Sequence, residues 1–384
     1  MTTLEVHDFA QIQDATLTFG DLTVLVGPQA SGKSLLLQWL KAAIDPEEIV
    51  GALREAGNDV SSAKNLIDLI FGEGMSAGWR EGETSVRFNG AAITPQSWRK
   101  GSKGGHGGRV FYIPAHRALL LAEGWPAPFM KLNADTPVVA RLFSQNLYQR
   151  FSGRQAAQLF PVERILKEQY RDLIDEAVFH GGRVELEKQG LRYKLRLAFD
   201  SGVELPFMTW TAGQREFTPL LLGLYHVLPP RKLKKRPEID WVIIEEPEMG
   251  LHPRAIVAVM VLALDLLWRG YKVVLSTHSP LVLDVAWAIK RMHERGARWQ
   301  LLAEALGLKN SVEVGKVMKG ALEADCRVYF MRIDQVSHRV STQDISALDP
   351  EAPDRNEADW GGLTGFSSKF GEAVRAAVVE ADAK

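Results

Sequence analysis

The stretch Gly27-Pro28-Gln29-Ala30-Ser31-Gly32-Lys33-Ser34 decides how the rest of the chain is interpreted. It fits the pattern G-x-x-x-x-G-K-[ST] of a phosphate-binding loop. It lies between residues 22–26, an apolar run typical of a buried strand, and residues 35–40, an apolar run typical of a helix. This order of strand, glycine-rich loop and helix predicts a nucleotide site.

Each residue type in the loop has a physical reason. Gly27 and Gly32 allow backbone conformations that side chains disfavour, so that successive N–H groups can face a phosphate. The helix that follows favours an anion at its N-terminus. Lys33 is predicted to contact the β- and γ-phosphates of ATP, and the Ser34 hydroxyl is predicted to be a ligand of Mg²⁺. The expected cofactors are therefore ATP and Mg²⁺.

Length and composition are those of a globular protein. The 384 residues suffice for one large α/β domain with an insertion, or for two domains. The net charge of −1 provides no global attraction to nucleic acid or to an anionic membrane. The longest apolar run, residues 255–264, is too short to cross a bilayer. Without a secretory signal pattern, and with Cys326 as the lone cysteine, the chain is expected to be cytoplasmic.

The order of strand and helix patterns divides the chain into four predicted parts. Residues 1–117 hold a hairpin pattern and the phosphate loop, and residues 118–182 have the spacing of a helical insertion, or lid. Residues 183–290 alternate strands and helices, as a parallel sheet with crossover helices would. Residues 291–384 are predicted to be a C-terminal α/β extension. The predicted fold class is α/β: a mostly parallel sheet with an N-terminal antiparallel part and a helical insertion.

Two adjacent carboxylates follow the apolar run of residues 241–244. Glu245 and Glu246 stand where the carboxyl end of a parallel strand would present them to Mg²⁺. We assign Glu245 to the metal and Glu246 to the attacking water. A strand that ends in a solvated acidic turn would explain the same residues, and the phosphate loop upstream is what favours catalysis.

A second strand pattern, residues 273–277, ends at His278. At the carboxyl edge of an open α/β sheet this imidazole would donate a hydrogen bond to the γ-phosphate. A histidine that merely ends a strand is the alternative. Its position on the strand pattern that follows Glu246 favours the catalytic assignment.

Thr211-Ala212-Gly213-Gln214, called the signature segment below, precedes the apolar helix pattern of residues 217–227. Small residues before a helix start can form a second anion site. A plain helix cap with Thr211 as the capping residue explains the same residues without any ligand.

The order of these motifs resembles the ABC-type ATPase heads of the recombination-and-repair and chromosome-maintenance class. It is similar in particular to the ATPase modules of the overcoming-lysogenization-defect (OLD) family and their relatives in bacterial anti-phage defence. The resemblance rests on residues 27–34, 211–214, 243–248 and 276–280, and it covers residues 1 to about 290. The chain departs from the class at Glu245, where Asp is commoner, and before the signature helix, where it lacks the usual Leu-Ser-Gly.

The resemblance implies a P-loop NTPase of the ABC-ATPase head type that hydrolyses ATP as a dimer. Each ATP would lie between one subunit's phosphate loop and the other subunit's signature segment, where Thr211, Gly213 and Gln214 would contact it. ATP would close the dimer and hydrolysis through Glu246 would open it. A Toprim nuclease domain commonly follows the ATPase in the OLD family, and a stand-alone ATPase without that domain is expected here.

Three functions remain as hypotheses. The first is an ATP-driven dimeric switch that controls a separate effector or nuclease in DNA repair or phage defence. The second is a DNA-binding repair ATPase without an effector, for which the basic residues in 99–109 and 231–236 offer phosphate contacts. The third, least favoured, is the ATP-binding subunit of a membrane transporter. The expected partners are a second copy of the chain and a separate effector, with DNA left open and no membrane.

Overall fold

The computed structural model describes residues 2–99, 108–121, 124–151, 157–189, 192–229 and 234–382. Its strands are β1 (Thr2–Phe9), β2 (Ile12–Phe19), β3 (Leu22–Val26), β4 (Ser85–Phe88), β5 (Ala91–Ile93), β6 (Val110–Ile113), β7 (Ala157–Phe160), β8 (Arg183–Gln189), β9 (Arg192–Ala198), β10 (Glu204–Pro206), β11 (Trp241–Glu245), β12 (Lys272–Thr277), β13 (Cys326–Ile333) and β14 (Val340–Asp344).

The helices are α1 (Lys33–Ile44), α2 (Pro46–Glu55), α3 (Ala63–Phe71), α4 (Pro95–Arg99), α5 (Val138–Phe151), α6 (Glu168–Ile174), α7 (Ala212–Val227), α8 (Pro253–Arg269), α9 (Pro280–Glu294), α10 (Trp299–Ala305), α11 (Val312–Leu322), α12 (Arg355–Ala358) and α13 (Gly365–Asp382). Short helical turns are η1 (Met75–Gly78), η2 (Arg117–Leu121), η3 (Phe129–Lys131), η4 (Asp175–Phe179) and η5 (Phe207–Thr209).

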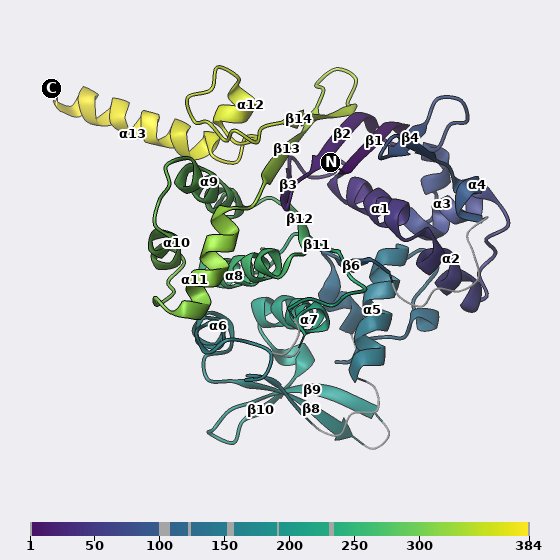
Figure 1. Cartoon of the computed structure of the whole chain (residues 1–384), viewed down its shortest axis with the longest axis horizontal. Coiled ribbons are helices and arrows are strands. Elements are labelled where there is room, and N and C mark those ends of the chain that lie inside the picture. Colours follow the sequence, from purple (N-terminus) through teal and green to yellow (C-terminus); the bar gives the residue numbers. More distant parts are fainter. Residues whose placement is uncertain are drawn as a thin grey trace.

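The strands form two sheets (Figure 1). The main sheet has the order β5-β4-β1-β2-β14-β13-β3-β12-β11-β6, and a smaller antiparallel sheet has the order β10-β9-β8-β7. Strands β13, β3, β12, β11 and β6 run parallel to their neighbours in that series. Strands β1, β2, β4 and β5 pair antiparallel at one end of the main sheet. The predicted fold class, with its N-terminal antiparallel part, is confirmed.

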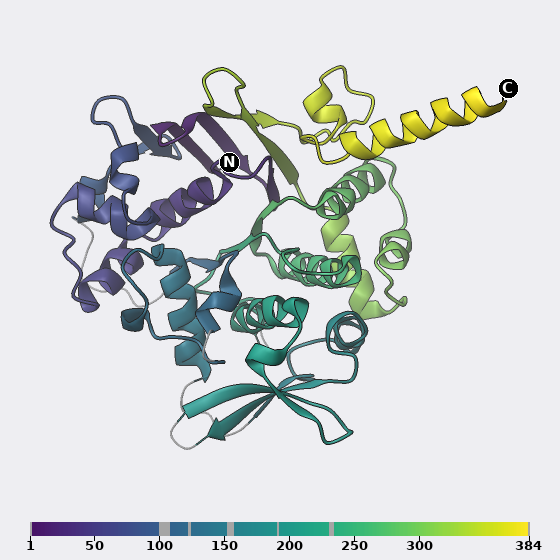
Figure 2. The same ribbon diagram turned by 180° about the vertical axis from the view of Figure 1, so that it is seen from behind.

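The parallel centre of the main sheet is buried on both faces. Along β3, Val24 and Val26 join one hydrophobic core and Leu25 joins the other. Along β11, Ile244 and Ile243 divide in the same way. Because successive side chains of a strand point to opposite faces, such continuous apolar runs need helices on both sides. Residues of α7, α8 and α9 cover one face, and residues of α1, α2 and α3 cover the other (Figures 1 and 2).

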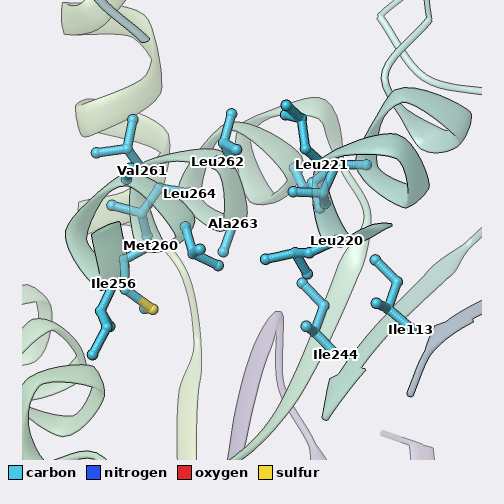
Figure 3. Close-up of a cluster of buried hydrophobic side chains, with 14 of the residues drawn as sticks. Ile113, Leu220, Leu221, Ile244, Ile256, Met260, Val261, Leu262, Ala263 and Leu264 are labelled. Atoms are coloured by element: carbon cyan, nitrogen blue, oxygen red, sulfur yellow. The ribbon is translucent and has the colours of Figure 1, made fainter. Parts of the chain in front are cut away.

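Helix α7 is held on the strand that ends at Glu245. Figure 3 shows Leu220 of α7 near Ile244 of β11 and Ile113 of β6, with Leu221 farther from these strands on the same helix. All four side chains are fully or almost fully buried. Burial of each such side chain contributes about 1.5–3 kcal/mol to folding. The helix that follows the signature segment is therefore fixed to two of the strands near the predicted catalytic carboxylates.

The C-terminal residues differ from the predicted extension, residues 291–384. Strands β13 and β14 lie inside the main sheet, between β2 and β3. Phe330 of β13 is opposite Val26 of β3, next to the phosphate loop. A pairing across about 300 residues leaves no local pattern in the sequence, so the sequence did not predict it. Residues 326–344 thus complete the sheet that carries the phosphate loop.

The predicted insertion, residues 118–182, is mainly helical, but it also contributes a strand to the small sheet. Strand β7 pairs antiparallel with β8, with Ala157 opposite Leu186. The predicted boundary at residue 182 therefore passes through the four-stranded sheet. At four residues, β7 is too short to give a clear alternation of polar and apolar side chains.

Helix α13 extends away from the body of the molecule in both views (Figures 1 and 2). Within the described residues, no helix combines the length and the hydropathy that crossing a bilayer requires.

Candidate nucleotide site

The phosphate loop joins β3 to α1 through unusual backbone angles. Gly27 has a φ of 149° and Gly32 a φ of 84°, both in the region that favours glycine. In the described part of the chain, no side chain caps the N-terminus of α1 and no acidic residue occupies its first turn. The N–H groups at this helix end are left for an anion.

The first loop glycine is also required by packing. A Cβ atom at Gly27 would lie 2.8 Å from the Cβ of Met331 and 2.9 Å from its carbonyl oxygen. We expect Gly27→Ala to lower the free energy of unfolding by about 2 kcal/mol and to weaken nucleotide binding. In the control Gly51→Ala, the new methyl group enters open space in α2, and a gain of about 0.5 kcal/mol is expected. Chemical denaturation measures both, and equal stabilities would contradict the prediction.

Lys33 is buried at the start of α1. Its ammonium group donates hydrogen bonds to the carbonyl oxygens of Gly27 at 2.9 Å and Pro28 at 2.8 Å. Burial lowers the pKa of Lys33 to about 8, and the carboxylates of Glu246 and Glu248 oppose that change. The lysine therefore loses its charge within a pH range that ordinary binding experiments reach.

This pKa predicts a pH dependence of ATP binding. Phosphates favour the charged ammonium, so ATP affinity falls as the pH rises through about 8. We expect binding of ATP with Mg²⁺ to be about tenfold weaker at pH 9 than at pH 7. Lys33→Arg keeps its charge over this range, and its lower affinity is expected not to change with pH. Calorimetric titration at both pH values measures the effect, and parallel profiles for the two proteins would contradict it.

Glu245 ends β11 as a buried carboxylate, 5% exposed. The backbone N–H of Ala115 donates to its Oε2 at 3.2 Å, and its Oε1 has no hydrogen-bond partner among the described residues. Burial raises the pKa of Glu245, and the Ser34 hydroxyl nearby is the largest opposing influence. A buried carboxylate oxygen without a partner, beside a hydroxyl, fits a hard divalent cation such as Mg²⁺.

Glu246 and His278 come together at the ends of β11 and β12. The Nε2 of His278 lies 3.4 Å from the Oε1 of Glu246, and this contact holds the pKa of Glu246 below its usual value. Glu246 has a φ of 39°, a conformation that side chains rarely adopt. Its backbone N–H donates to the backbone carbonyl of Ser276 at 2.9 Å, and this hydrogen bond helps to hold that conformation. Such a strained residue at a strand end is typical of a functional position.

A pocket of about 200 Å³ opens over the loop. It is lined by Gln11, Gln29, Ala30, Ser31, Gly32, Lys33, Ser34, Leu35, Glu246 and His278. The structure thus brings the predicted loop residues 29–34 together with Glu246 and His278, whereas Gly27, Pro28 and Glu245 are not among the lining residues. Thr211, Gly213 and Gln214 do not line it. The signature segment therefore lies outside its own chain's phosphate pocket.

The signature segment begins α7 with a capping box. The Thr211 hydroxyl accepts from the N–H of Gln214 at 3.3 Å, and the Gln214 side chain accepts from the N–H of Thr211 at 3.2 Å. The capping alternative for Thr211 is therefore present in the structure. Thr211 and Ala212 are nevertheless exposed at the helix N-terminus, where a phosphate can reach them.

Three further residues at the site, Gln11, Arg117 and Glu248, had no role predicted from the sequence. The Oε1 of Glu248 accepts from the Thr277 hydroxyl at 2.8 Å and from the backbone N–H of His278 at 2.5 Å, so it joins the ends of β11 and β12. The run of three glutamates around Pro247 was a signal for it. Gln11 donates to the carbonyl of Ala30 at 3.3 Å and gave no local signal.

The two predicted basic surfaces are described only in part. Lys100, Lys103, Arg231 and Lys232 lie outside the described residues. Arg109 and Lys235, one from each basic stretch, both form ion pairs with Asp240, at 2.6 and 2.8 Å. These two cations therefore already have a carboxylate partner.

The phosphate loop between β3 and α1, with carboxylates and a histidine at the ends of β11 and β12, is the arrangement of a P-loop NTPase of the ABC-ATPase head type. Residues 68–284, more than half of the chain, match the family described as "AAA domain, putative AbiEii toxin, Type IV TA system". The chain matches none of the curated proteins.

Several solved structures are similar to the chain. The SMC head domain from Thermotoga maritima is 12% identical, with a TM-score of 0.39 over 89% of this chain and 97% of that one. The SmcHead bound to the C-winged helix domain of ScpA is 14% identical, with a TM-score of 0.38 over 89% and 96%. CbiO1 from Clostridium perfringens, part of the ABC transporter complex CbiONQ, is 10% identical, with a TM-score of 0.33 over 88% and 86%. On the family match, the chain belongs to the AAA-domain family of putative AbiEii toxins of type IV TA systems.

Proposed function

We propose that the chain is an ATP-hydrolysing dimeric switch that controls a separate effector in phage defence or DNA repair. The observation that carries the proposal is the position of the signature segment. Glu246 and His278 line the phosphate pocket, whereas Thr211 and Gly213 do not. An exposed helix N-terminus outside its own chain's pocket is suited to bind a nucleotide held by a second chain.

Within each chain we assign the chemistry as follows. Lys33 contacts the terminal phosphates, and Ser34 with Glu245 holds Mg²⁺, which neutralises phosphate charge when bound. Glu246 accepts a proton from the attacking water, and its lowered pKa keeps it in the basic form at neutral pH. His278, which contacts Glu246, donates a hydrogen bond to the γ-phosphate.

Exposed apolar side chains near the signature segment support a surface for a second copy. Met208, in η5, is three residues before Thr211 and is 57% exposed. Leu119, in η2, is 73% exposed, and η2 packs against α7. Burial of such side chains on association adds a favourable hydrophobic contribution. We propose that this surface contacts the partner when ATP joins the two chains.

Control of an effector is the part that rests on family likeness. The family description refers to a putative toxin of a type IV system, and the motif order resembles ATPases of the OLD family. Both favour an ATPase whose nucleotide-bound state governs the activity of a separate effector protein. We therefore propose that closing and opening of the dimer is the signal that an effector protein reads.

A mixing experiment tests whether the signature segment acts on the partner's nucleotide. Lys33→Ala removes the phosphate contact, and Gly213→Asp adds a negative charge at the α7 N-terminus, so neither variant alone is expected to hydrolyse ATP. If the sites are shared, each mixed dimer contains one intact site, and an equal mixture regains about a quarter of the wild-type rate. A mixture as inactive as its components would contradict the shared site.

A further inference from the structure

A completely buried arginine joins β11, the strand that ends at Glu245, to α7, the helix that begins in the signature segment. Arg117, the first residue of η2, has 0% of its surface exposed. Its Nε donates to the backbone carbonyl of Glu216, in the second turn of α7, at 3.0 Å. Its Nη1 lies 3.2 Å from the carbonyl oxygen of Glu245 and 3.4 Å from that of Glu246. One guanidinium thus contacts the main chain of both elements.

Burying a guanidinium opposes folding unless hydrogen bonds or ion pairs compensate for its lost hydration. Burial lowers the pKa of Arg117 to about 10. Its Nη2 has no hydrogen-bond partner among the described residues. An apolar side chain of similar volume would avoid this cost. The Nη1 of Arg117 also lies 3.4 Å from the carbonyl oxygens of Pro114 and Ala115. The guanidinium therefore holds the carbonyl oxygens of three chain segments in fixed relative positions, which an apolar side chain could not do.

Among the residues that Arg117 contacts, Glu246 is the predicted general base, so its position matters most for hydrolysis. Its φ of 39° needs support from its surroundings. The N–H of Glu246 is bonded to Ser276, and its carbonyl faces Arg117, so contacts act on both sides of the strained residue. The first two turns of α7 also pack against the turn at Gly250, where an added Cβ would lie 3.3 Å from Glu216. A shift of α7 would therefore reach the main chain of Glu246.

We infer that Arg117 is a positioning residue that couples the signature helix to the catalytic carboxylates. When a phosphate occupies the N-terminus of α7, the helix position is transmitted through the Glu216 carbonyl and Arg117 to Glu246. The inference rests on the proposed function, because it requires that Glu246 activates water and that the signature segment binds the partner's nucleotide. It adds the physical link by which nucleotide binding at the α7 N-terminus sets the position of Glu246.

The test compares Arg117→Met and Arg117→Lys in the full chain. We expect Arg117→Met to keep the KM for ATP within about threefold, while kcat falls about 100-fold because the general base is displaced. Arg117→Lys retains a donor for the strand carbonyls and is expected to recover part of kcat. About 10 mM guanidinium added to Arg117→Ala is expected to restore kcat at least tenfold by filling the vacated space.

The control is Arg141→Met. Arg141 is another buried arginine, 3% exposed, whose guanidinium lies 4.0 Å over the ring of Phe129. We expect this variant to keep the wild-type kcat and guanidinium to leave that kcat unchanged. The coupling itself is tested with Thr211→Ala: the double variant with Arg117→Met should be no slower than the slower single variant.

The outcomes separate this inference from the proposed function. If Arg117→Met keeps wild-type kcat, or if its effect multiplies with that of Thr211→Ala, Arg117 does not couple the two elements. If Lys33→Ala and Glu246→Gln hydrolyse ATP as well as the wild type does, the proposed function fails instead. Loss of hydrolysis in those two variants together with normal Arg117→Met turnover would overturn the inference alone.

Discussion

Lys33→Ala is expected to weaken ATP binding by about 100-fold or more. The ammonium group of Lys33 is 2.9 Å from the carbonyl of Gly27 and 2.8 Å from that of Pro28, inside the curve of the phosphate loop. Phosphate oxygens would exchange for these carbonyls and gain charge-assisted hydrogen bonds. Removal of the group also takes away a positive charge that interacts with the carboxylates of Glu246 and Glu248. Isothermal titration with ATP and Mg²⁺ measures the loss.

Lys41→Met is the matched control, because Lys41 lies in the same helix and is also buried. Its ammonium group is bonded to Asp45 and Glu48 and donates to the carbonyl of Val110 at 2.8 Å. Loss of these two ion pairs is expected to lower the free energy of unfolding by about 3 kcal/mol, while the folded protein keeps its affinity for ATP. ATP affinity in Lys33→Ala within about threefold of the wild type would contradict the assignment of the phosphate loop.

The sequence was sufficient to bring the phosphate loop, Glu245, Glu246 and His278 into one prediction, because each motif is local. A strand that ends in polar residues presents them at the carboxyl edge of the sheet wherever that strand lies. Strands β3, β12 and β11 are neighbours in the structure. The order of the motifs was therefore enough to predict that these residues lie close together, without knowledge of the strand order.

What the sequence did not reveal depends on contacts between distant residues. The Tyr329 hydroxyl donates to the carbonyl of Thr18 at 3.0 Å, across 311 positions of sequence, and Met331 packs against Gly27. The first contact joins β13 to β2 and the second holds β13 against the phosphate loop, and no periodic pattern in residues 291–384 signals either of them. Arg117 was equally hidden, since only the fold shows that its surroundings are carbonyl oxygens rather than solvent.

The signature segment combines a structural helix cap with an exposed helix end. Thr211 and Gln214 satisfy each other's backbone N–H groups, as a purely structural cap would. The same helix end is exposed and outside its own phosphate pocket. Capping and binding in a dimer use different partners for the same atoms, so the second role becomes testable only with two chains and a nucleotide.

Glu246→Gln is expected to bind ATP normally, to hydrolyse it about 10³-fold more slowly and to accumulate as a dimer. The amide keeps the size and hydrogen-bonding shape of the carboxylate but cannot accept a proton from water. Loss of the negative charge near Lys33 and the phosphates does not oppose binding. Because the ATP-bound state is no longer consumed, the closed dimer persists. Light scattering should record one chain's mass without nucleotide and a doubled mass with ATP and Mg²⁺.

Glu73→Gln provides the comparison, because Glu73 is exposed in the turn after α3 and does not line the phosphate pocket. This variant should hydrolyse ATP at the wild-type rate and show no persistent dimer. A Glu246→Gln variant that stays monomeric at saturating ATP would contradict the shared site, even if hydrolysis is lost. The exposed N-terminus of α7 would then be a capped helix end only, and control of an effector would have to operate within a single chain. A doubled mass that requires ATP, together with recovery of activity in mixed dimers, would instead tie occupancy of the phosphate pocket to association of the two chains.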